Sequence, residues 1–220
     1  MIKLPFPVYR RHSFLKRASG WSRRDFSHYY EHNHGPLAAG LRGFRKFATR
    51  YIQNHVDDLP DREDPLFDGV TITTQVPRDD YSRGFREEPD FNAVKVDEQY
   101  LFDLDKTVSV LGRQDTVPYG NSAPHKALIL CTQQALQSIQ LLRPAKLVLN
   151  HLEPSTASGF AADADAFDYD LLAEVWFDTI TARNDAIETS RSLQSRTTPA
   201  LVLPVREVLI FGPEKPWIGD

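Results

Sequence analysis

The stretch YIQNHV at residues 51–56 returns in the second half of the chain as LVLNHL at residues 147–152. A second echo follows each of them, LFDGVTI at residues 66–72 and DYDLLAE at residues 168–174. Each echo alone is weak, but the two recur in the same order with matching elements on both sides, which favours an internal duplication. We therefore expect the 220 residues to form two copies of one structural unit.

The first copy is predicted to contain four strands and two helical regions. Ser22 is suited to be a helix N-cap, and Asp25 completes a capping box, so a helix is predicted to begin at Arg23. The other predictions follow from β-branched and aromatic runs and from turn residues. They are strands at 8–16, 46–56, 67–76 and 107–111, an acidic loop at 59–65, and helical pieces over 81–102.

The second copy repeats this order after a break in the chain. Residues 116–125 contain two prolines, a glycine and an asparagine, which is typical of a linker. The elements predicted beyond it are strands at 127–132, 146–152, 169–177 and 202–211, helices at 133–142 and 182–193, and a small-residue loop at 154–165. We place the first repeat at 1–117, the linker at 118–125, and a second, degenerate repeat at 126–220.

The order β-α-β-β-α-β is that of the ferredoxin-like motif, and it is predicted twice. Two such units can lay their sheets face to face and close a barrel, which buries the second face of each sheet and removes open strand edges. The predicted fold class is therefore α+β, with tandem ferredoxin-like repeats that form an internal, pseudo-dimeric α/β barrel.

Composition excludes several classes of protein. The chain is 41% hydrophobic and 25% charged, as in ordinary globular proteins, and no apolar run approaches the ~20 residues of a membrane span. The N-terminus has prolines and charges where a signal peptide needs an apolar run, and the single Cys131 permits no internal disulfide. A cytoplasmic protein that does not bind membranes is expected.

Charge is unevenly distributed along the chain. Residues 1–50 contain eleven Lys and Arg against two Asp and Glu, whereas residues 57–105 contain fifteen acidic and five basic residues. Either the two segments pair their charges, or a positive rim attracts an anionic substrate. No nucleic-acid-binding fold accompanies the basic segment, so no nucleic-acid partner is expected. The absence of a glycine-rich phosphate loop and of a dinucleotide fingerprint argues against nucleotide cofactors.

Three segments of the first copy resemble the EthD-like family of the dimeric α/β-barrel superfamily: FLKRASGWSRRDFSHYYEHNHGPLA at 14–38, YIQNHV at 51–56 and FDGV at 67–70. The resemblance implies a barrel and chemistry on aromatic or polyketide-like compounds, since relatives include lyases, dehydratases, decarboxylases, isomerases and cofactor-free oxygenases. Some relatives have no known activity. The second copy keeps Asn150-His151 and the stretch EVWFD at 174–178 but has no His-x-Pro helix.

Histidines cluster in HYYEHNH at residues 28–34, and a metal site is the first interpretation to consider. His28, Glu31 and His32 match the pattern H-x-x-E-H, and histidines at i and i+4 can share a metal on one helix. That pattern also needs a further carboxylate ligand on a much larger scaffold, and Gly35-Pro36 interrupts the helix at once. We expect neither a metal site nor a cofactor.

An acid–base role for His34 is the better interpretation. His34 follows Tyr30 by four residues and precedes Leu37 by three, so it shares the apolar face of the helix, whereas His28 and His32 lie to one side. Pro36 has no N–H and must kink or break the helix. A buried imidazole near neutrality suits proton transfer. The alternative is a core histidine bonded to a carbonyl that the kink frees. The His-x-Pro match to the family favours the catalytic role.

The strand at 46–56 carries the other candidates. Tyr51, Gln53 and His55 share one face by the two-residue period of a strand, and Asn54 lies on the other face. A Tyr-Gln-His face can line a cavity, or it can be the wet face of an edge strand. We predict Tyr51 and His55 as catalytic residues beside His34. The predicted substrate-binding residues are Tyr30, Asn54, Glu174 and Trp176.

These observations favour a cofactor-independent lyase that dehydrates, decarboxylates or cleaves a small aromatic or polyketide-like molecule by general acid–base catalysis. Two alternatives stay open: a cofactor-free monooxygenase that acts on a phenol, and a non-catalytic protein that binds a small molecule. A homodimer is a further expectation.

Overall fold

The computed structural model describes residues 2–57, 64–75, 85, 87–156, 158–159, 167–192 and 201–215. Several predictions fall outside these residues: most of the loop 59–65, the end of the strand 67–76, the start of the helical region 81–102, most of the loop 154–165, and residue 193. Among the described residues, no helix is long and apolar enough to cross a membrane.

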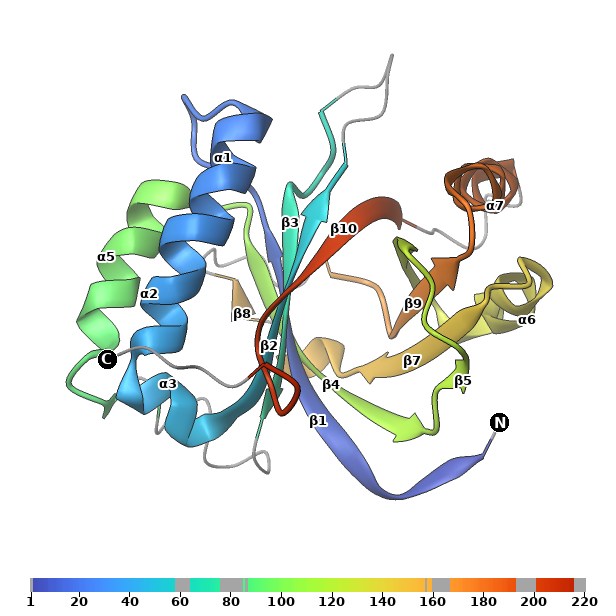
Figure 1. Cartoon of the computed structure of the whole chain (residues 1–220), viewed down its shortest axis with the longest axis horizontal. Coiled ribbons are helices and arrows are strands. Elements are labelled where there is room, and N and C mark those ends of the chain that lie inside the picture. The colour runs from blue at the N-terminus through green and yellow to red at the C-terminus, as the bar shows by residue number, and fades with distance from the viewer. Residues whose placement is uncertain are drawn as a thin grey trace.

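The first repeat consists of one sheet and the helices that cover it (Figure 1). Its helices lie together on one side of the molecule. They are α1 (Arg23–Tyr29), a π-helix (Tyr30–His34), α2 (Gly35–Gly40), α3 (Arg42–Phe47) and α5 (Phe91–Leu101). The strands are β1 (Lys3–Leu15), β2 (Ala48–Val56), β3 (Gly69–Gln75) and β4 (Val108–Thr116).

The second repeat has the same order. Its strands are β6 (His125–Cys131), β7 (Lys146–Leu152), β9 (Leu171–Phe177) and β10 (Leu201–Phe211), and its helices are α6 (Leu136–Leu141) and α7 (Ile180–Ser192). The short elements are β5 (Tyr119–Gly120), β8 (Ser158–Gly159) and 3₁₀ turns at Gln133–Ala135 and Pro154–Thr156. The segment predicted as a linker therefore contains β5 and the first residue of β6.

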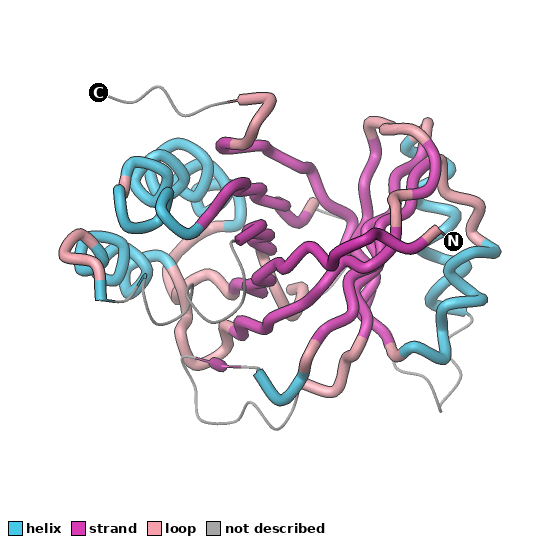
Figure 2. Tube along the Cα trace, turned by 90° about the horizontal axis from the view of Figure 1, so that it is seen from below, coloured by secondary structure: helices cyan, strands magenta, loops and turns pink. Residues whose placement is uncertain are grey.

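The strands close into an eight-stranded antiparallel barrel. Each repeat contributes four adjacent strands, in the orders β4-β1-β3-β2 and β10-β6-β9-β7. Two pairings join the repeats: β10 with β2, where Val205 faces Val56, and β4 with β7, where Gly112 faces Leu152. The predicted internal α/β barrel is confirmed. Figure 2 shows the strands in the middle of the molecule, with helices outside them on two sides.

Four apolar clusters of described residues fill the spaces between these layers, and the smallest packs α1 and the π-helical turn against the end of α5. One occupies the barrel interior and includes Phe14, Val70, Leu128 and Leu172. The second lies between the second repeat's sheet and its helices α6 and α7. The third packs α2, α3 and α5 against β2 and β10. Residues 51–56 of β2 are buried or half-buried on both faces, so neither face of this stretch is wet, contrary to the edge-strand alternative.

Several boundaries differ from the predictions. Residues 46 and 47 belong to α3 instead of the following strand, which begins at Ala48. β1 begins at Lys3, five residues earlier than predicted, and pairs with the end of β4, which runs on to Thr116. The helix predicted to begin at Arg23 does begin there, because Ser22 Oγ accepts the N–H of Asp25 at 3.1 Å.

Charges of the two oppositely charged segments pair in the folded chain. Arg17 and Lys16 form ion pairs with the buried carboxylate of Asp68, and Arg23 and Arg17 also bind Asp64. These contacts fasten the end of β1 and the start of α1 to the segment that precedes β3. They favour charge pairing as the reason for the uneven distribution.

Candidate functional site

The helix over residues 23–40 changes its hydrogen-bonding pattern where the histidines cluster. Pro36 has no N–H to offer the carbonyl of His32, and the N–H of Gly35 bonds instead to the Tyr30 carbonyl, five residues earlier. The result is one π-helical turn at Tyr30–His34. The turn keeps the Tyr30 and His34 side chains buried, while His28 and His32 are exposed.

Tyr30 stands at the centre of the space between this helix and the sheet. Its side chain is fully buried and packs over Gly69, where an added Cβ would lie 3.3 Å from the ring. Its hydroxyl shares a 2.5 Å hydrogen bond with Thr71 Oγ1 on β3. Burial raises the pKa of Tyr30 well above its ordinary value, so the phenol stays neutral. The ring centroids of His55 and His34 lie 5.0 and 5.6 Å away.

His34 is hydrogen-bonded to a carboxylate from α5. Its Nδ1 lies 2.7 Å from Asp97 Oδ2, and Tyr29 donates its hydroxyl to Asp97 Oδ1 at 2.8 Å. Burial alone would raise the pKa of Asp97, but these two hydrogen bonds outweigh it and hold the pKa below its ordinary value. An ionised Asp97 places the imidazole proton on Nδ1, which leaves Nε2 of His34 as the proton acceptor.

The outer face of β2 completes this space. Gln53 donates its amide to the Tyr51 hydroxyl and to the Tyr30 carbonyl, each at 2.8 Å. His55 Nδ1 lies 2.8 Å from Ser27 Oγ on α1. Burial, followed by the charge of Arg206, lowers the pKa of His55 to about 4, so its ring is neutral at pH 7. We call these groups between the helix and the sheet the polar layer: Tyr30, His34, Tyr51, Gln53, His55, Thr71 and Asp97.

Two buried atoms of the polar layer have no hydrogen-bond partner within the described part of the chain, Gln53 Oε1 and His55 Nε2. An unsatisfied buried polar atom destabilises a fold by about 1–3 kcal/mol. A bound water or ligand would satisfy both. The polar layer therefore contains an acceptor on Gln53 and a ring nitrogen on His55 that are not used in the hydrogen bonds of the described chain.

The corresponding layer of the second repeat is apolar. Its sheet presents residues such as Ile129, Leu149 and Val175 to the helices, and they pack against Ile139 and Ile187. Cys131 is buried in the same layer, and burial raises the pKa of its thiol to about 12, so it is not a reactive thiolate. The same position in the fold is thus a packed core in one repeat and a polar layer in the other.

The predicted site residues divide into two groups. His34, Tyr51, His55 and Tyr30 come together in the polar layer. Asn54, Glu174 and Trp176 instead point into the barrel, on the opposite face of the sheet, so they do not line the same space. The structure therefore separates three of the four predicted substrate-binding residues from the predicted catalytic ones.

Inside the barrel, Glu174 belongs to a buried ion-pair network. Arg10 donates to it at 2.9 Å and Lys126 at 2.7 Å, and Asn150 donates its amide at 3.1 Å. Burial would raise the pKa of Glu174, but the two cations outweigh it and lower the pKa to about 2. Trp176 packs beneath Lys126, whose Nζ lies 4.5 Å from a ring centroid. These ion pairs are enough to explain why a carboxylate is buried at this position, without a role in catalysis.

The H-x-x-E-H stretch does not gather a set of metal ligands. The rings of His28 and His32 lie in tilted contact with their centroids 4.5 Å apart, and Glu31 accepts a hydrogen bond from Arg206 at 2.7 Å. Within the ranges that the structure describes, no three His, Cys, Asp or Glu side chains are placed to hold a metal ion.

Asp97 was not among the predicted site residues, although the sequence contains a signal for it. Val94 and Leu101 mark the buried face of α5, and Asp97 follows Val94 by three residues, so it shares that face. A carboxylate on a buried helical face is expensive unless it is paired. Thr71 is harder to find, because a threonine in a strand is ordinary.

Comparison with known proteins agrees with the resemblance found in the sequence. Residues 18–105 match the EthD domain family, and these residues carry the whole polar layer. No curated protein matches the chain.

Three solved structures are similar over most of their own length. They are a candidate monooxygenase from Lactobacillus acidophilus NCFM (6% identity, 92% of this chain and 95% of that one, TM-score 0.45), a candidate chlorite dismutase (10%, 94% and 96%, 0.47) and a dimeric ferredoxin-like protein of unknown function from Thermobifida fusca YX (13%, 50% and 97%, 0.35). Likenesses at this level add no argument about function.

Proposed function

Because residues 18–105 match the EthD domain family, we propose that the polar layer is an enzyme site. In this proposal it binds a small, largely apolar aromatic molecule and acts on it by general acid–base catalysis without a cofactor. The observation that carries the proposal is the contrast between the repeats. One fold position is filled by aliphatic side chains in the second repeat and by histidines, tyrosines and a carboxylate in the first.

His34 is proposed as the group that transfers the proton. Asp97 holds its Nδ1–H, so Nε2 takes a proton from the substrate, and the resulting imidazolium is stabilised by the carboxylate 2.7 Å away. Tyr51 and His55 are proposed to bind the substrate's polar group from β2. Tyr30 is proposed to form an apolar wall with Phe102, whose ring centroid lies 5.3 Å from that of His34.

A lyase reaction suits this set of groups. In a dehydration, His34 would remove the proton next to a carbonyl, and a second group would protonate the leaving hydroxyl, which departs as water. Decarboxylation and retro-aldol cleavage need the same donor and acceptor. A cofactor-free monooxygenase would use the same base to deprotonate a phenol but would consume oxygen, and a binding protein would retain ligand without converting it.

The substrate class can be found by a screen of aromatic metabolites. Ligands that raise the melting temperature would be incubated with the protein, and mass spectrometry would show whether their mass changes. Loss of water or carbon dioxide from the substrate supports the lyase. Oxygen uptake on turnover would replace it with the monooxygenase, and binding without any mass change would replace it with the binding protein.

Substitution of His34 tests its role directly. We expect His34→Gln to lower kcat by ~10²–10⁴-fold, the usual loss when a positioned acid–base group is removed. His32→Gln is the matched control, because His32 is exposed on the same turn and should leave kcat unchanged. Circular dichroism and thermal melting must show both variants folded. Full activity in His34→Gln, or its loss in His32→Gln, would refute the assignment.

A further inference from the structure

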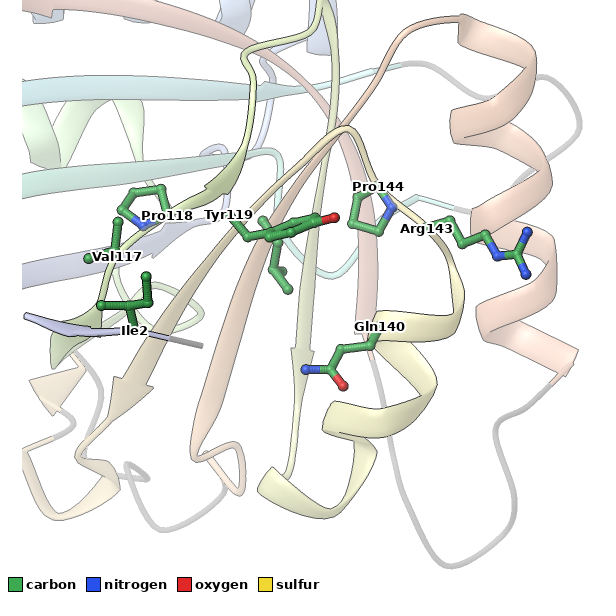
Figure 3. Close-up of a pocket in the computed structure, with 8 residues that line it drawn as sticks. Ile2, Val117, Pro118, Tyr119, Gln140, Arg143 and Pro144 are labelled. Carbon is green, nitrogen blue, oxygen red and sulfur yellow. The ribbon is translucent and has the colours of Figure 1, made fainter.

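Both repeats contribute residues to a groove, and Figure 3 shows its lining side chains. Figure 1 shows β5 and α6, two of the elements around it, on the opposite side of the molecule from α1 and α2. The groove runs between β5, the start of β1 and the C-terminal end of α6. Its volume is about 740 Å³, which is within the range of small-molecule sites. Its apolar walls are Ile2, Val117, Pro118, Pro144 and Leu147.

Three polar side chains complete the lining: Tyr119, Gln140 and Arg143. All three are exposed, and within the described part of the chain none of their side chains has a hydrogen-bond or ion-pair partner. No carboxylate is among the described residues that line the groove. The groove therefore combines apolar walls with one uncompensated positive charge, which suits an apolar anion.

Arg143 has an unusual backbone conformation for a residue with a side chain. Arg143 has φ of +50°, the left-handed region, and in the described residues it is the one non-glycine residue with a positive φ. It follows α6, and its N–H closes the last turn by bonding to the Gln140 carbonyl at 3.2 Å. Glycine or asparagine is favoured at this position. An arginine held in a disfavoured conformation beside a groove points to a function of its side chain.

We propose that this groove is a second, non-catalytic binding site for a small aromatic carboxylic acid. The ring would lie against Tyr119 and the flat faces of Pro118 and Pro144, and the carboxylate would bind Arg143. In Figure 3 the Arg143 side chain extends from the rim away from Tyr119. Because it is exposed and without a described partner, it can rotate towards a bound anion at the expense of rotamer entropy alone.

A small molecule fits the groove better than a second protein chain. Eight of the described residues line it, whereas a stable interface takes about 20–30 residues from each side. The proposal is independent of the function of the polar layer, because no residue is shared between the two sites.

The test uses 2-naphthoate as the aromatic acid and 2-naphthamide as its neutral counterpart, both titrated into the full chain by calorimetry. We expect Arg143→Gly to weaken 2-naphthoate binding about five- to tenfold and Arg143→Lys to retain most of it. Binding of 2-naphthamide should not depend on Arg143. Val117→Trp, which fills the groove from its exposed edge, should abolish binding of both compounds.

Two controls show whether a loss of binding comes from the groove, from unfolding of the variant, or from the polar layer. Glycine suits the left-handed backbone, so Arg143→Gly should melt at the same temperature as the parent protein or higher. Two substitutions in the first repeat should leave 2-naphthoate binding unchanged: His34→Gln in the polar layer, and Arg24→Ala, which removes an exposed arginine far from the groove. Binding that is lost in His34→Gln but kept in Arg143→Gly and Val117→Trp would overturn the proposal.

Two other results would also overturn it. One is the absence of binding at millimolar 2-naphthoate. The other is concentration-dependent self-association in sedimentation that Val117→Trp prevents, which would make the groove an interface between copies of the chain.

Discussion

At the scale of single residues, Asp97 decides which nitrogen of His34 is available for chemistry. Its carboxylate accepts from Nδ1, and a hydroxyl from Tyr29 holds its second oxygen. An asparagine would keep the size of the side chain but would offer an amide N–H to Nδ1, which moves the imidazole proton to Nε2. The proposed site would then lose its proton acceptor, although the His34 ring is still present.

We therefore expect Asp97→Asn to lower kcat by about 10–10²-fold, less than the loss of His34 itself. A purely structural role would leave the pH profile unchanged. The proposed positioning role predicts that the acidic limb of the kcat profile shifts to lower pH, since the imidazolium loses its counter-charge. A pH profile of Asp97→Asn identical in shape to that of the parent protein would contradict this role.

Alternation along β2 predicts correctly that Tyr51, Gln53 and His55 share a face. It cannot tell which face meets the helix that carries His34. Both faces of β2 are buried, one under helices and one inside the barrel, so hydrophobicity does not distinguish them. That ambiguity explains why Asn54, Glu174 and Trp176, predicted as part of one site, lie across the sheet from it.

At the scale of elements, the π-helical turn brings the helix close to β2 at Gly35. A Cβ at this position would lie 3.0 Å from Gln53 Nε2, 3.1 Å from Ile210 Cδ1 and 3.3 Å from the Tyr30 carbonyl oxygen. The Gln53 amide that would be displaced holds both Tyr30 and Tyr51. Gly35 is thus a point of close packing on which the geometry of the polar layer depends.

Gly35→Ala should destabilise the protein by about 1–3 kcal/mol through overpacking, and the ~1 kcal/mol that alanine gains in helix propensity offsets part of this. Urea unfolding measures the change. A double-mutant cycle with Gln53→Ala locates the cause, because shortening Gln53 should recover part of the loss. Additive effects of the two substitutions would show that the crowding lies elsewhere.

The helix boundaries show which features of local structure the sequence predicts and which it does not. Ser22 and Asp25 predict the start at Arg23 because a side chain caps the first turn there. Pro36 predicts an irregularity but not its kind, since a missing N–H can be accommodated by a kink, a break or a π-turn. The end of α3 was missed because Lys46 and Phe47 suit a strand as well as a helix.

At the scale of the whole molecule, two buried histidines make stability depend on pH. Burial lowers the pKa of His12, inside the barrel, to about 3, and that of His55 to about 4. The unfolded chain takes up these protons below pH ~6.5, and the folded chain does not. Their contribution to stability is therefore complete above pH 6.5 and is lost as the pH falls towards 4.

We expect the free energy of unfolding to fall by roughly 1.4 kcal/mol per pH unit for each of these histidines between pH 6.5 and 5. His12→Gln should reduce this slope by about one proton, and His32→Gln, at an exposed position, should not. Urea titrations at several pH values give the slopes. An unchanged slope in His12→Gln would mean that the imidazole is protonated inside the barrel.

The fold as a whole was predictable because its signal is spread over the entire chain. Two echoes and a repeated order of strands and helices are enough to specify two ferredoxin-like units and their closure. The charges inside the barrel were not predictable. Lys126 and Glu174 lie on neighbouring strands of the second repeat, but Arg10 comes from the first repeat and reaches Glu174 only after closure.

The two seams of the barrel, β10 with β2 and β4 with β7, join halves of one covalent chain. In a dimer of identical subunits, any substitution is made twice, so both halves must tolerate it. A tandem chain is free of that symmetry. One half can exchange its polar groups for aliphatic packing that stabilises the fold, while the other half keeps the π-helical turn and the unsatisfied polar atoms of the proposed site.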